Sequence, residues 1–157
     1  MKEAIGGNWL FMIVIFFVIL FAGYMCLSIN QTKAFNVKNS LIRILERNGS
    51  GMSSVADLAD DINFIDEVTA ELAEVGYRIN GDCTRFEEEY GPGWTGFDEQ
   101  GNLSDTNSAF CVRRVETASA LGAPRYYYQV ITFYHLEIPL VRTIFNLSIK
   151  GDTKPMI

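Results

Sequence analysis

The feature that most constrains this chain is a run of apolar residues close to its N-terminus. Residues 9–29, WLFMIVIFFVILFAGYMCLSI, are the strongest part, and no charged side chain occurs between Ala4 and Thr32. A helix needs about 20 apolar residues to cross the hydrocarbon core of a bilayer. A cleavable signal peptide instead has an apolar region of about 7 to 15 residues after a basic start. The run therefore predicts a retained membrane helix.

The helical pattern continues beyond the apolar run, because no Pro or Gly follows until Gly49. The pattern predicts one helix from Ala4 to Arg47, about 66 Å long, apolar all round in its first half and on one side in its second. The glycine-rich stretch that begins at Gly49 is expected to end it. The apolar stripe of the second half is expected to pack on the globular part of the chain through Ala34, Val37, Leu41 and Leu45.

The remaining residues, 49–157, are enough for one compact domain. Around Val55 and Leu58 the sequence predicts a short helical turn. Asn63 is the predicted N-cap of a helix that runs from Phe64 to Val75 and ends at Gly76. The predicted apolar face of this helix comprises Ile65, Val68, Leu72 and Val75.

The second half of the domain is expected to form loops and then strands. Residues 81–108 are rich in glycine, with a solvated loop at Glu87–Glu89 and a short hairpin around Gly101. Residues 125–138 alternate with the period of a strand, and a last strand is expected from about Thr143 to Lys150. The predicted fold class is α+β, with a helix region at 1–48 packed on one face of a small antiparallel sheet in a head domain at 49–157.

The chain has three cysteines. Cys26 lies in the apolar run, whereas Cys83 and Cys111 lie 28 positions apart in the head. Neither belongs to a CxxC pair, so a structural zinc site is not expected. We predict that Cys83 and Cys111 form a disulfide in an oxidising compartment, with two buried free thiols as the alternative.

Charge and motifs exclude several classes of function. The net charge is −6 and no basic stripe is visible, so nucleic acid is not an expected partner. His135 is the only histidine, no P-loop or GxGxxG occurs, and no base is placed beside a nucleophile. We therefore expect neither an enzyme nor a cofactor or metal site. A calcium site is the alternative to solvated helix caps for Asp57, Asp60, Asp61, Asp66 and Glu67, which lack the EF-hand spacing.

A long N-terminal helix, apolar first and amphipathic second, followed by a small antiparallel sheet, resembles the type IV pilin superfamily. The C-terminal pattern FYHLEIPLVRTIFNLSIKGDT is similar to the ends of Tad-type minor-pilin-like proteins of bacteria. Prepilins carry a Glu five residues into the mature chain, whereas the fifth position after Gly7 is Met12 here, and the nearest acid is Glu3.

The resemblance implies a structural, pilin-like subunit of a bacterial cell-surface filament that assembles with copies of itself or related subunits. The helix residues expected to contact lipid before assembly and sister helices after it are Glu3, Trp9, Phe11, Ile13, Phe16, Phe17, Ile19, Phe21, Tyr24 and Ile29. The alternative is a single-pass, membrane-anchored binding domain that does not polymerise.

The head is expected outside the cytoplasm, chiefly because of the cysteine pair. The positive-inside count opposes this orientation. Lys2 precedes the apolar run, whereas Lys33, Lys38, Arg43 and Arg47 follow it.

Overall fold

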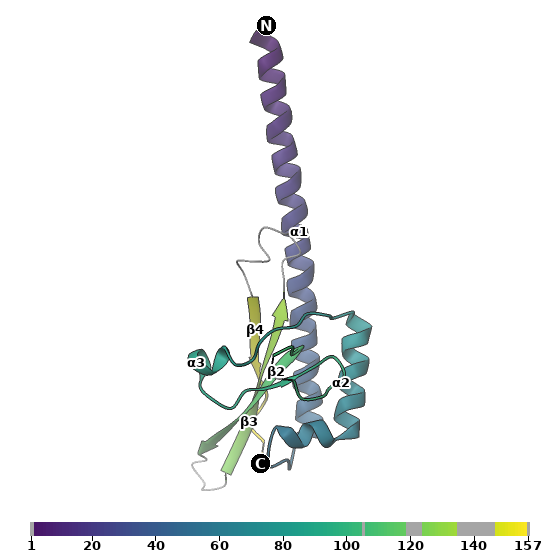
Figure 1. Cartoon of the computed structure of the whole chain (residues 1–157), viewed down its shortest axis with the longest axis vertical. Helices are drawn as coiled ribbons and strands as arrows, with labels where there is room; N and C mark the ends of the chain where they lie inside the picture. The colour runs from purple at the N-terminus through teal and green to yellow at the C-terminus, as the bar shows by residue number, and fades with distance from the viewer. Residues whose placement is uncertain (1, 105, 119–123, 135–146, 157) are drawn as a thin grey trace.

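The structure, a computed structural model, describes residues 2–104, 106–118, 124–134 and 147–156. Its main feature is α1 (Lys2–Asn48), one unbroken helix of 47 residues. At 1.5 Å per residue α1 is about 70 Å long, and its N-terminal half stands clear of the other elements (Figure 1). The predicted single helix is confirmed, with ends that differ from the prediction by no more than two residues.

After α1 the chain forms a short 3-10 helix, η1 (Ala56–Asp60), and then α2 (Ile62–Val75). The predicted cap of α2 is wrong, because Asp61 and not Asn63 precedes its first turn. The backbone of Asp61 is extended, and its carboxylate accepts a hydrogen bond of 2.9 Å from the Asn63 N–H. This bond satisfies an amide that has no partner inside the helix. The predicted end of the helix is confirmed, because Gly76 has the left-handed φ of 64° that favours glycine.

The buried face of α2 is turned slightly from the predicted one. Phe64, Val68 and Leu72 are buried, whereas the predicted Ile65 and Val75 are half-buried. The spacing of four residues puts the three buried side chains in one row. The Phe64 ring packs edge-on against Phe97 of the sheet, with 5.7 Å between ring centroids.

The sheet is antiparallel throughout and has the order β1-β2-β3-β4. Its strands are β1 (Thr95–Phe97), β2 (Phe110–Ala118), β3 (Pro124–Tyr134) and β4 (Leu147–Asp152). The predicted hairpin lies beside β1, where Gly101 has a φ of 79° and Phe97 forms a bridge with Leu103. The α+β architecture predicted from the sequence is therefore confirmed.

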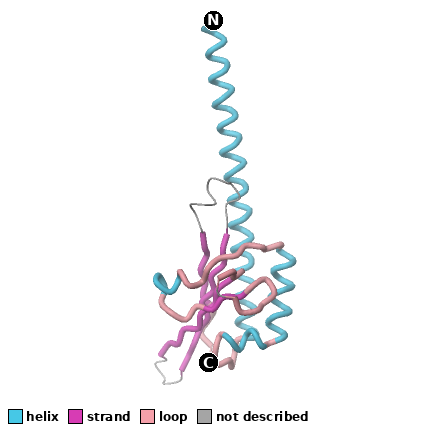
Figure 2. The backbone as a smooth tube through the Cα atoms, in the orientation of Figure 1, coloured by secondary structure: helices cyan, strands magenta, loops and turns pink. Residues whose placement is uncertain are grey.

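The lower half of α1 lies between the sheet and α2 (Figures 1 and 2). The four residues predicted to pack on the head all have no exposed surface: Ala34, Val37, Leu41 and Leu45. They share one core with β2, β3 and α2, which includes Val68, Val112 and Val130. The second half of α1 is thus part of the folded core.

The helix covers one face of the sheet, as predicted, and the other face is covered as well. A second cluster packs on the face away from α1, and it comprises Cys83, Phe86, Trp94, Cys111, Ile131 and Phe133. Much of this cover comes from the segment before β1, which includes α3 (Phe86–Tyr90). Glu87–Glu89 are therefore helical and not a loop. The apolar residues on the second face of β3, Ile131 and Phe133, explain why that face is covered.

Parts of three predictions lie outside the described residues. The predicted strand at 125–138 is described as far as Tyr134, and the predicted strand from Thr143 is described from Leu147. His135 also lies outside the described residues.

Candidate functional site

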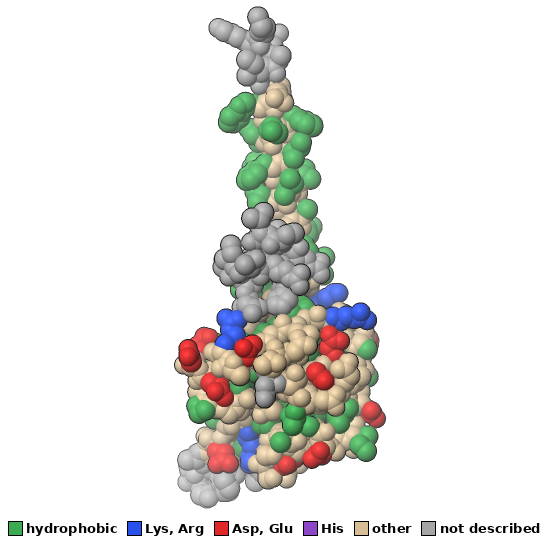
Figure 3. Space-filling model, in the orientation of Figure 1, with side chains coloured by type: hydrophobic (Ala, Val, Ile, Leu, Met, Phe, Trp, Pro, Cys, Tyr) green, Lys and Arg blue, Asp and Glu red, His purple; other side chains and the backbone are tan. Residues whose placement is uncertain are grey.

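The apolar half of α1, residues 9–29, is exposed on every side of the helix as far as Ala22, whereas Gly23, Cys26 and Leu27 are half-buried. Relative exposures reach 70% for Trp9, 67% for Phe21 and 69% for Tyr24. All the described members of the predicted assembly surface are exposed: Trp9, Phe11, Ile13, Phe16, Phe17, Ile19, Phe21, Tyr24 and Ile29. The side chain of Glu3 lies outside the described structure. Figure 3 shows these apolar side chains around the upper helix and the charged ones on the head.

This surface satisfies the length and composition of a membrane span. Its most apolar window of 18 residues has a mean hydropathy of 2.8 and none of it is buried within the molecule. The 21 residues from Trp9 to Ile29 extend about 32 Å as a helix, close to the thickness of a bilayer core. A monomeric soluble protein rarely leaves so large an apolar surface uncovered. The surface therefore needs lipid or another protein as cover.

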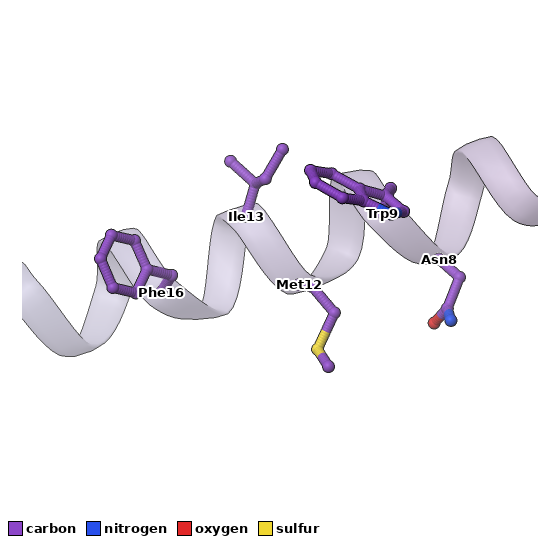
Figure 4. Close-up of a pocket in the computed structure, with 5 residues that line it drawn as sticks. All are labelled: Asn8, Trp9, Met12, Ile13 and Phe16. Carbon is purple, nitrogen blue, oxygen red and sulfur yellow. The ribbon is translucent and has the colours of Figure 1, made fainter.

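One hollow on this surface lies between the side chains of Asn8, Trp9, Met12, Ile13 and Phe16. Figure 4 shows that all five come from α1, with Asn8 and Met12 projecting from one side of the helix and Ile13 from the opposite side. A single helix cannot enclose a cavity, so this hollow is a gap between neighbouring side chains. The Asn8 amide adds a hydrogen-bonding group that can join helices in an apolar surrounding.

The exposed half of α1 is held in a fixed direction by the attachment of the lower half. On the sheet side, the Thr132 hydroxyl donates a hydrogen bond of 3.1 Å to the Ala34 carbonyl. On the α2 side, the Arg47 guanidinium lies 2.9 Å from the carboxylate of Glu67, which also accepts a bond of 3.2 Å from Asn48. The buried residues of α1 from Ala34 to Leu45 and these polar contacts fasten α1 to the sheet on one side and to α2 on the other.

Two tyrosines of β3 form hydrogen bonds with the C-terminal end of α1. The hydroxyls of Tyr126 and Tyr128 both donate to the Gly49 carbonyl, at 3.1 and 3.2 Å. The Tyr126 hydroxyl also accepts a bond of 2.7 Å from the Gly51 N–H. The expected helix end is thus confirmed, but Gly49 is required for a close approach and not for a positive φ. The left-handed residue of this turn is Gly51, with a φ of 87°.

The outer face of the sheet carries the disulfide between Cys83 and Cys111 that the sequence predicted. It joins the segment that precedes α3 to β2. Beside it, the Arg113 guanidinium lies 5.3 Å from the centre of the Trp94 ring, and it donates a hydrogen bond to the Tyr90 carbonyl. The disulfide and this aromatic contact therefore fasten the same loop to the sheet.

Three of the five acidic residues weighed as a calcium site have protein partners, namely Asp57, Asp61 and Glu67. The Asp57 carboxylate accepts four hydrogen bonds from Ser53 and Ser54, which lower its pKa to about 2. Asp61 caps α2 and Glu67 pairs with Arg47. Within the described ranges, no three His, Cys, Asp or Glu side chains form a group that could hold a metal ion.

Sequence reasoning missed two groups at the junction between helix and head. Tyr126 and Tyr128 were expected on one strand face, but no local pattern shows that both hydroxyls meet Gly49. Lys38 was considered only as one of the cations that follow the apolar run, whereas only 8% of it is exposed. Lys38 follows the buried Val37, so its position beside the apolar stripe was the one available signal.

Comparisons of this chain with known protein families, with curated protein sequences and with solved structures give no match.

Proposed function

We propose that this chain is a structural, pilin-like subunit of a bacterial cell-surface filament. Its N-terminal helices would bundle into the filament core and leave the heads outside. One observation carries the proposal: α1 is a single helix whose first half is exposed and apolar on all sides, while its second half is built into the head. Before assembly the same exposed half would hold the subunit in the membrane.

The rigid junction supports assembly more than simple anchoring. A domain that is only tethered to a membrane needs no fixed angle between its anchor and its fold. In this chain, contacts to Thr132 on one side and Glu67 on the other hold α1 against both layers of the head. Packing of many identical helices requires each head to repeat the same orientation, because the contacts of a symmetric assembly recur in every copy.

The disulfide supports a head outside the cytoplasm. Disulfides persist in oxidising compartments and are rare in the cytosol. The Cys83–Cys111 bond is buried among aromatic side chains of the head, with both cysteines almost wholly covered. We place the head on the extracytoplasmic side, in the membrane before assembly and at the cell surface after it.

The proposal is tested by electron microscopy of material sheared from cells, with the protein identified in the filaments by mass spectrometry. Recovery of the protein as a monomer in the membrane fraction alone would contradict assembly. That outcome would favour the non-polymerising, membrane-anchored binding domain.

Cross-linking adds a sharper test of the helix contacts. With Cys26→Ser as background, Phe16→Cys should join neighbouring subunits under mild oxidation of assembled material. The matched control is Asp60→Cys, at an exposed position of η1 in the head. Equal cross-linking at both positions would show random collision, and cross-linking at neither would argue against a helical core.

A further inference from the structure

The helix turns that leave the apolar run carry an excess of positive charge. No Asp or Glu occurs between Glu3 and Glu46, whereas Lys33, Lys38 and Arg43 all lie in the segment between Ile29 and Glu46. The remaining acids, from Glu46 onward, belong to the lower end of α1 and the rest of the head. The helix turns nearest the apolar run therefore carry cations and no acid.

Lys38 has an unusual surrounding for a charged side chain. It is 8% exposed, and its stem packs on β4 so closely that a Cβ on Gly151 would lie 2.9 Å from its Cδ. Its ammonium lies 4.2 Å from the centre of the Phe35 ring. It forms neither a hydrogen bond nor an ion pair with any residue that the structure describes. The Lys38 ammonium nitrogen is not among the fully buried polar atoms. The covered stem therefore leaves the charge accessible at the surface, where an anion from outside the molecule can reach it.

The two lysines lie in or next to the headgroup layer when the apolar run spans the bilayer core. At 1.5 Å per residue, Lys33 lies about 6 Å beyond Ile29, the last residue of the apolar run. A helical side chain points toward the N-terminus, and the Lys38 ammonium accordingly lies over Phe35, about 9 Å beyond Ile29. The headgroup layer is about 5 to 8 Å thick on each side of a bilayer. Lys33 therefore falls within this layer, and the Lys38 charge lies just beyond its outer edge.

We propose that Lys33 and Lys38 bind the phosphates of anionic phospholipid headgroups, and that this contact sets how deeply α1 sits in the membrane. Phe35, which is 48% exposed, completes the site as an aromatic side chain at the interface. The inference rests on the membrane-inserted state of the proposed function and does not depend on filament assembly.

The test reconstitutes the full chain into vesicles of phosphatidylcholine alone or mixed with phosphatidylglycerol. Cys26 is the free cysteine and lies three residues before Ile29, so its reaction with a water-soluble maleimide reports the depth of α1. Phosphatidylglycerol should slow the labelling of Cys26 by roughly fivefold for each lysine engaged. The variant Lys33→Gln/Lys38→Gln should lose this slowing, and Lys33→Gln alone should lose about half of it on a logarithmic scale.

The control variant is Lys154→Gln, whose side chain is exposed and whose contact with Glu46 is made by the backbone. It should keep the full effect of phosphatidylglycerol. Equal labelling of the wild-type chain in both kinds of vesicle would overturn the inference, as would unchanged slowing in the double variant. Slowing by inorganic phosphate in phosphatidylcholine vesicles would overturn the assignment to lipid. A chain that does not float with vesicles would instead contradict membrane insertion itself.

Discussion

The Tyr128 hydroxyl donates a hydrogen bond of 3.2 Å to the carbonyl of Gly49, and the Tyr128 ring occupies the space where a side chain at residue 49 would lie. The contact joins the end of α1 to the centre of the sheet across 79 positions of sequence. It fixes where the helix stops and the direction in which its other end points. The stability of this junction is therefore directly connected to the proposed role of α1.

Replacing Gly49 by Ala should destabilise the head. An added Cβ would lie 2.6 Å from both the Leu45 carbonyl oxygen and Cε2 of Tyr128. Overpacking of this kind costs about 1–3 kcal/mol of unfolding free energy, which denaturant titration in detergent would measure. The control is Gly7→Ala, because a Cβ at Gly7 meets nothing within 4 Å. An unchanged stability of Gly49→Ala would show that Tyr128 can move away freely.

High pH should weaken the same junction. Burial raises the pKa of Tyr128 to about 12, and burial also raises the pKa of Tyr77. The unfolded chain releases its phenolic protons near the ordinary pKa of 10.0, before the folded chain does. The stabilising contribution is therefore complete below pH 10 and decreases as the pH rises toward 12.

Unfolding midpoints measured across this alkaline range, for the wild type and for Tyr128→Phe, would test the assignment. The variant should start less stable and lose less with rising pH, while Tyr77 maintains part of the slope. Parallel curves for the two proteins would mean that Tyr128 is not a source of the alkaline loss.

Acid should weaken the turn that follows α1. Hydrogen bonds from the Ser53 side chain and from Ser54 lower the pKa of Asp57 from 3.8 to about 2. The stabilising contribution of this carboxylate is present above about pH 4 and is lost as the pH falls toward 2. Asp57→Asn should flatten the dependence of stability on pH in that window. Asp60→Asn is a suitable control, since Asp60 is an exposed acid in the same 3-10 helix. An identical response of both variants would exclude the serine contacts as the cause.

Reduction of the Cys83–Cys111 disulfide should lower the unfolding free energy of the head by about 2–4 kcal/mol. The bond limits the conformations open to the unfolded chain, and reduction removes this limit. Denaturation with and without a phosphine reductant measures the difference. Mass mapping of the protein isolated from cells without reductant should find the two residues joined. Ready alkylation of both cysteines in that material would contradict an extracytoplasmic head.

Local patterns were sufficient to predict α1, the short turn at η1, α2 and most of the sheet, but not α3. The period of the apolar residues in α1 identified Ala34, Val37, Leu41 and Leu45, because burial on one side of a helix leaves a repeat that the sequence displays directly. The alternation in β3 is the corresponding repeat for a strand. Gly76 was informative because a left-handed residue at a helix end favours glycine. The N-cap of α2 was misplaced because Asp61 and Asn63 are both good caps, and the choice depends on the backbone angles of the preceding turn.

The aromatic cluster on the face of the sheet away from α1 could not be predicted from a local pattern. Glu87–Glu89 look like a solvated loop in sequence, and they are indeed exposed. Phe86 beside them is buried against Phe133, with 5.8 Å between ring centroids. Only the path of the chain, fastened by the disulfide and by Arg113 on Trp94, brings that aromatic cluster onto the sheet.

The sequence by itself determined that one helix is apolar first and amphipathic second, that the head is α+β, and that Cys83 and Cys111 are suited to pair. These properties follow from composition and period, which each segment carries alone. The tertiary structure decided how the helix is fastened to the head, through Gly49 under Tyr128, and where the Lys38 charge lies, over Phe35. Both arrangements depend on α1 packing against strands that lie far from it in the sequence. No local sequence pattern shows that these residues will meet.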